Sequence, residues 1–155
     1  PMLWARLRIE AVALHKLGRT DEALAVLDGV PEGDVIRDEI EWGRRNWKAL
    51  SASDNLPTAT GGLLSEVEQT IILRRAVALA MLGRESELAS LRTRYARAFA
   101  GQTASAPFDL LTAPVEGLDS ANVTQAMAAM PAASPAGDIA DLLVGEPRRT
   151  KRASS

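Results

Sequence analysis

The sequence predicts an all-α protein, and three observations support this fold class. Alanine and leucine are abundant, whereas the aromatic residues are limited to three tryptophans, two phenylalanines and one tyrosine. Such a composition suits helices that pack through small side chains. Apolar and small residues recur three and four positions apart, which is the spacing of one helix face. Finally, the pattern L-G-R-x-x-E occurs twice, at residues 17–22 and 82–87.

The first half of the chain predicts three helices. Leu3, Leu7, Ala11 and Leu14 share one face of a first helix that Gly18 ends, and Thr20 caps a second helix over residues 21–30. A third helix is expected over residues 36–50, in which Gly43 lets a neighbour approach closely. Residues 51–62 have the composition of a loop that is long for a helical bundle.

The second half predicts two more main helices and a different closing region. Ser65 and Glu68 form a capping-box pattern, so a fourth helix begins after Ser65 and continues to Leu82. A fifth helix follows Gly83 and ends near Gly101. The expected organisation is a helical region over residues 1–101, a cap of short helices over residues 102–145, and a mobile basic tail over residues 146–155.

Composition excludes several classes of function. The net charge is −2, there is no cysteine, and His15 is the only histidine. We therefore expect no metal, no cofactor, no nucleic-acid partner and no catalytic residues. The longest apolar run is interrupted by arginines and is too short to cross a bilayer, and no signal peptide is evident. Since the chain has no cysteine that would indicate a redox environment, the compartment stays open between cytoplasm and periplasm. Two alternatives also stay open: the chain is part of a longer polypeptide, or it forms a homo-oligomer.

The two L-G-R-x-x-E segments lie in longer matching windows. A-V-A-L-H-K-L-G-R-T-D-E-A-L from Ala11 and A-V-A-L-A-M-L-G-R-E-S-E-L-A from Ala76 share eight residues in register. The offset of 65 residues is close to twice the ~34-residue period of helix–turn–helix repeats. Residues 3–30 resemble a tetratricopeptide repeat through Ala11, Gly18 and the Asp21-Glu22-Ala23 triplet, and residues 72–99 resemble one more weakly. Leu14 departs from that family's usual tyrosine.

The resemblance implies a TPR-like α-solenoid of about five main helices that acts as a protein-interaction scaffold. In that family the first helix of each repeat lines a groove that binds a peptide or protein segment. Carried over by position, the partner-binding residues are Arg8, Val12, His15, Lys16, Leu73, Val77 and Met81. The alternative for these residues is a solvated helix face in the first repeat and packed core in the second. Catalysis at His15 is not expected, since no partner group lies nearby in sequence.

Two further features have open interpretations. Arg92, Arg94 and Arg97 lie on the fifth helix, where they either contact an acidic partner or form a solvated face. The short helices after Gly101 either cap the solenoid or fill its groove as an internal ligand. In the second case the chain is a structural helical domain of a larger enzyme or envelope assembly. The loop at residues 51–62 is expected to run back along the third helix and to replace the missing second helix of a middle repeat, so that the first and fourth helices run parallel.

Overall fold

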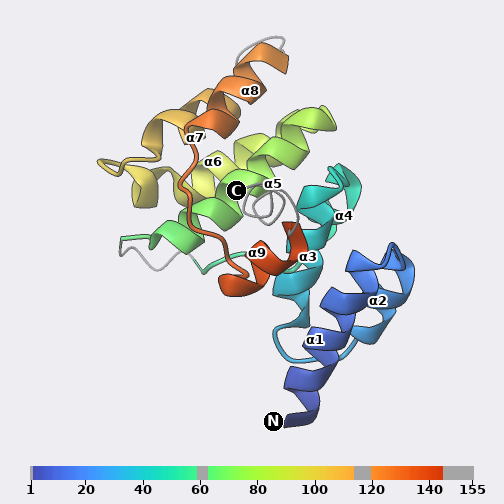
Figure 1. Ribbon diagram of the computed structural model, residues 1–155. Helices are drawn as coiled ribbons and strands as arrows, with labels where there is room; N and C mark the ends of the chain where they lie inside the picture. The colour runs from blue at the N-terminus through green and yellow to red at the C-terminus, as the bar shows by residue number, and fades with distance from the viewer. Residues whose placement is uncertain (1, 59–62, 114–119, 145–155) are drawn as a thin grey trace, which may run out of the picture. The chain divides into compact units, whose positions relative to one another are not determined.

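The computed structural model describes residues 2–58, 63–113 and 120–144, and within these ranges all regular structure is helical (Figure 1). The all-α prediction is therefore confirmed. No helix in the described ranges is both long and apolar enough to span a membrane. In chain order the helices are α1 (Met2–Lys16), α2 (Thr20–Val26), α3 (Gly33–Gly43), α4 (Trp47–Ala52), α5 (Glu66–Met81), α6 (Glu85–Phe99), α7 (Ser105–Thr112), α8 (Ser120–Ala128) and α9 (Asp138–Val144).

The chain divides into two compact units. The first comprises the described parts of Pro1–Arg44 and Ala136–Ser155, and the second is Arg45–Pro135. This division differs from the expected one, because α9 joins the first unit and the short helices α7 and α8 join the second. The basic tail at residues 146–155 lies outside the described residues.

The first unit is built on a small aliphatic core, which we call the unit-1 cluster. It consists of the buried residues Ala11 of α1, Ala23 and Leu27 of the α2 region, and Ile36 and Ile40 of α3. Each of them is at most 2 % exposed. Because Ala23 and Leu27, like Ile36 and Ile40, are four residues apart, each pair lies on one face of its helical segment and turns that face toward the cluster.

The second unit is arranged around α5, which packs against α4, α6, α7 and α8. Ile72, Leu73, Ala76 and Val77 of α5 have no exposed surface, as expected of a helix enclosed by neighbours. The ring of Phe99 in α6 stacks on that of Phe108 in α7, with 4.2 Å between the ring centroids. Two of the short helices after Gly101, α7 and α8, thus form a packed layer in this unit.

The two L-G-R segments fold into the same turn. The amide of Gly18 donates to the carbonyl of His15 at 3.0 Å, and the amide of Arg19 donates to that of Leu14 at 2.9 Å. In the second unit Gly83 donates to Ala80 at 3.1 Å and Arg84 to Leu79 at 3.0 Å. These paired bonds form the Schellman motif, which requires the left-handed φ values of +82° at Gly18 and +71° at Gly83.

The arginine and the glutamate of the repeated pattern form an ion pair across the first turn of the next helix. Arg19 Nη2 lies 2.9 Å from Glu22 Oε1, and Arg84 Nη1 lies 3.7 Å from Glu87 Oε2. The hydrogen bond from Arg19 lowers the pKa of the Glu22 carboxyl. Both glutamates also stand near a helix N-terminus, where a negative charge is favourable. The whole L-G-R-x-x-E pattern therefore specifies one helix–turn–helix geometry.

The predicted third helix is divided in two. α3 ends at Gly43, Arg45 takes a left-handed φ of 57°, and the side chain of Asn46 accepts a hydrogen bond from the Ala49 amide to begin α4. The prediction of a close neighbour at Gly43 is wrong, since a Cβ there would meet nothing within 4 Å. The close approach occurs instead at Gly33, where a Cβ would lie 2.7 Å from the Leu27 carbonyl oxygen.

The predicted loop is attached to the second unit. Ser51 and Ala52 belong to α4, and residues 53–58 follow without regular structure. Arg75 donates to the carbonyl of Ser53, and the Tyr95 hydroxyl donates to that of Pro57. The part of the loop that is described thus lies against α5 and α6, while residues 59–62 are outside the described ranges. The expected parallel direction of the first and fourth helices relates two separate units and stays a prediction.

Helix starts and ends follow local sequence closely in the second unit. The capping box is confirmed: Ser65 Oγ accepts from the Glu68 amide at 3.1 Å, and Glu68 Oε1 accepts from the Ser65 amide at 2.9 Å. α5 ends one residue before the expected Leu82. These short-range features need only neighbouring residues, which is why the sequence predicts them.

Candidate functional site

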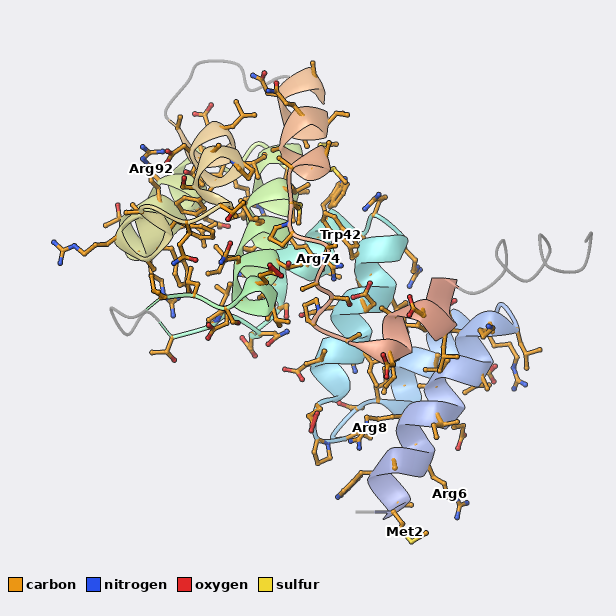
Figure 2. All side chains as sticks on the ribbon, turned by 60° about the vertical axis from the view of Figure 1, so that its left-hand side comes forward. Met2, Arg6, Arg8, Trp42, Arg74 and Arg92 are labelled. Atoms are coloured by element: carbon orange, nitrogen blue, oxygen red, sulfur yellow. The ribbon has the colours of Figure 1, made fainter. Side chains whose placement is uncertain are left out.

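Arg8 and Val12, two of the four partner-binding residues predicted on α1, are engaged within the first unit. Arg8 Nη1 donates to the carbonyl oxygen of Pro31 at 2.8 Å, so the side chain ties α1 to the segment before α3. Figure 2 shows Arg8 directed toward that segment, whereas Met2 and Arg6 point away from the unit. Val12 is 6 % exposed and belongs to the core. Val12 therefore has almost no surface to give to a partner, and the guanidinium of Arg8 is already engaged by Pro31.

His15 and Lys16 lie at the end of α1. The half-buried His15 ring has its Nδ1 atom 3.0 Å from Thr20 Oγ1, and Lys16 is exposed. Burial, and then the positive charge of Arg44, lower the pKa of His15. The expectation that Thr20 caps α2 is wrong: Thr20 is the first residue of the helix, and Arg19 stands at the N-cap without a side-chain cap. Thr20 instead bonds to His15.

The apolar half of the predicted groove lies on α5, and two of its three residues are core. Leu73 and Val77 have no exposed surface, and only Met81, at 46 %, is accessible. A side chain without exposed surface has no area to give to a partner, so Leu73 and Val77 match the alternative that they are packed core. The reason is that α5 is enclosed by four helices, a tertiary fact that the sequence pattern alone does not reveal.

The three arginines of α6 differ in their surroundings. Arg92 Nη1 lies 3.2 Å from Thr112 Oγ1 and 3.6 Å from Asp109 Oδ1, so it links α6 to α7 (Figure 2). The guanidinium of Arg94 lies over the Tyr95 ring, 5.1 Å from its centroid. Arg97 is exposed in the last turn of α6, where a positive charge suits the helix C-terminus. The three side chains do not converge on one site.

The outer face of α1 carries exposed aliphatic residues that are not among the predicted partner-binding residues. Met2 is 84 % exposed and Ile9 is 66 % exposed, although both are aliphatic. Leu17, just beyond the end of the helix, is 71 % exposed. The spacing of seven between Met2 and Ile9 is visible in the sequence, but periodicity does not tell which of two apolar stripes faces the core.

The main candidate site is the surface of the first unit that α9 covers. α9 contacts both α1 and α3, and its Ile139 and Leu143 pack against the unit-1 cluster. Their spacing of four puts both on one face of α9. No described side chain of α9 is fully buried. Leu142, which is next to Leu143 in the chain, is 51 % exposed. α9 therefore lies on the cluster rather than inside it.

No group of three or more histidine, aspartate or glutamate side chains among the described residues is placed to hold a metal ion. No protein-family model matches this chain, and comparisons with curated proteins and with solved structures find no match. The geometry of the two units is therefore the basis for any functional proposal.

Proposed function

We propose that the chain is a non-catalytic protein-interaction scaffold with TPR-like helical repeats. Its binding surface is the part of the first unit formed by α1 and α3, and its ligand is a short helical segment of a protein. One observation carries this proposal: α9 contacts α1 and α3, and its Ile139 and Leu143 pack against the unit-1 cluster. In the TPR family these helices, the first and third, line the ligand groove.

The form of α9 supports a helix-in-groove mode of recognition. The helix has seven residues, and isolated helices shorter than about 12 residues are marginal in water. Its helical form therefore depends on the surface beneath it. Aliphatic anchors at positions i and i+4 of an amphipathic helix are the usual contacts of that recognition mode.

The repeated turn supports the scaffold half of the proposal. Both helix–turn–helix segments use a left-handed glycine, the same two backbone hydrogen bonds and an arginine–glutamate pair. Repetition of one such unit within a chain is typical of helical-repeat proteins that present surfaces to partners.

A second candidate is a structural helical domain of a larger assembly. It is favoured by the second unit, in which α7 and α8 pack against α5 and bury Phe108 and Val123. In that unit α7 and α8 cover α5, which is the helix whose sequence resembles the groove-lining helix of a repeat. On this alternative α9 is a permanent part of the first unit, and no external segment binds.

Selection of helical peptides by the whole chain tests the two candidates. A library of short peptides with randomised apolar positions is selected on the immobilised protein, and the bound peptides are titrated into isotope-labelled protein. The scaffold function predicts peptides with aliphatic residues four apart and shifts in the amide signals of α1 and α3. Recovery of no binding peptide, or shifts confined to α6 and α7, would favour the structural domain.

A further inference from the structure

We infer that α9 is a built-in competitor: it occupies the helix-binding surface of the first unit and must leave before a helix from another protein can bind. The inference rests on the proposed function. It adds the regulation of the site and the chemistry of the ligand, which is a short amphipathic helix with aliphatic residues four apart and acids in its first turn, as in α9.

The burial pattern separates α9 from the core helices of its unit. Ala11 of α1 and Ala23 of α2 have no exposed surface, and Ile36 and Ile40 of α3 are 2 % exposed. In α9, by contrast, Ile139 and Leu143 are only half-buried, and Asp138, Asp141 and Leu142 are exposed. A helix that gives no fully buried side chain to a core contributes less to it than the helices that do. Displacing α9 therefore removes no fully buried side chain from the unit-1 cluster.

The route of the chain makes α9 a tethered ligand. Residues 129–137 connect α8 of the second unit to α9 of the first, and they include Pro131, Pro135 and Gly137. A segment held in this way binds with an effective concentration that depends on the length of its tether. An external helix can bind only the molecules in which the surface is uncovered. Its apparent dissociation constant is therefore the intrinsic constant divided by the uncovered fraction.

Two neighbouring leucines provide a matched test. Leu143 packs against the unit-1 cluster, whereas Leu142 is 51 % exposed on the same helix. In the test variant I139D/L143D, aspartate replaces Ile139 and Leu143, the two residues that pack against the cluster, so the apolar contacts of α9 are lost. The control variant L142D leaves these contacts in place. The probe is a synthetic peptide of residues 135–145, and binding is followed by amide shifts of α1 and α3 in the isotope-labelled full chain.

The inference predicts that I139D/L143D binds the peptide with a dissociation constant at least about tenfold lower than the wild-type chain does. L142D is expected to behave as the wild type. If the peptide binds the wild type and I139D/L143D with equal affinity, α9 does not block the surface and the inference is wrong, whereas the proposed binding surface is still supported. Failure of the peptide to bind any variant overturns both.

A second variant covers the case in which I139D/L143D does not fold. Inserting nine glycine and serine residues after Ala133 doubles the connection of residues 129–137 and leaves α9 itself unchanged. Because effective concentration falls roughly as the −3/2 power of tether length, the apparent dissociation constant of the peptide should decrease about threefold. An unchanged constant in this variant contradicts a tethered competitor.

Discussion

His15 Nδ1 lies 3.0 Å from Thr20 Oγ1, so a side-chain hydrogen bond joins the last turn of α1 to the first residue of α2. The bond spans the repeated turn of the first unit. At the corresponding place in the second unit, Ala80 and Glu85 stand where His15 and Thr20 stand in the first. The turn geometry is the same in both units, so the His15–Thr20 bond adds a feature that the fold of the turn does not require.

The first prediction is a loss of stability at mildly acidic pH. The pKa of His15 is lowered in the folded chain, below the ordinary value of 6.5. As the pH falls below 6.5, the unfolded chain therefore takes up a proton more readily than the folded one, which favours unfolding. The histidine-linked stability is complete above pH 6.5 and is lost as the pH falls. Urea unfolding between pH 5 and 8 measures it.

The control is H15Q, which removes all histidine titration because His15 is the only histidine. Its free energy of unfolding should change less between pH 7.5 and 5.5 than that of the wild type. Parallel pH profiles for the two proteins would show that His15 does not contribute.

The second prediction concerns the glycines of the two turns. G18A and G83A should each destabilise their unit by about 1–2 kcal/mol, because a Cβ disfavours the left-handed conformation. No atom lies within 4 Å of the Cβ that would be added at either position, so backbone strain is the cause rather than a clash. G43A is the matched control: it adds a Cβ into open space at the last residue of α3, where alanine is the better helix former. Chemical denaturation of the three variants checks this, and a loss in G43A as large as in G83A would contradict it.

The third prediction concerns the segment held by α6. Y95F removes the hydroxyl that donates to the Pro57 carbonyl and keeps the buried ring. Loss of this hydrogen bond should cost about 1 kcal/mol of unfolding free energy. It should also speed amide exchange in residues 53–56, since one attachment of this segment is gone. Unaltered exchange in that segment would mean that Arg75 and the backbone suffice to hold it.

The fourth prediction tests the layer formed by α6 and α7. Phe108 has no exposed surface and stacks on Phe99, so F108A should destabilise the second unit by roughly 3–5 kcal/mol. Thermal unfolding followed by circular dichroism measures this effect. L63A provides the control, because Leu63 is 85 % exposed and its loss should change stability by about 0.5 kcal/mol or less. A small effect of F108A would indicate that α7 is not an integral layer.

Much of the local structure was predictable because it depends on adjacent residues. Gly18 and Gly83 end helices, and Ser65 with Glu68 begins one, as their sequence patterns indicate. The division of the third helix was not predicted, because the apolar spacing of residues 36–50 continues through the break at Arg45. Periodicity records which residues share a face, and it does not record a change of backbone direction.

The candidate site was only partly predictable. Arg8, His15 and Lys16 were placed on α1 correctly, yet the first two already bond within their own unit. Leu73 and Val77 were expected to line a groove and are core instead. An apolar residue on a helix has the same sequence pattern whether another helix or a partner covers it, so burial cannot be derived from the pattern.

The sequence by itself determined the helical class, the repeated turn and the helix starts and ends, because these depend on backbone conformations and hydrogen bonds within a few residues. Only the tertiary structure decided which apolar stripes are covered and by what. It enclosed α5 among four helices, and it brought Ile139 and Leu143 of α9 onto a cluster built by α1 to α3, about 100 to 130 residues earlier in the chain. Contacts at that separation depend on the packing of the whole chain, and no local pattern encodes them.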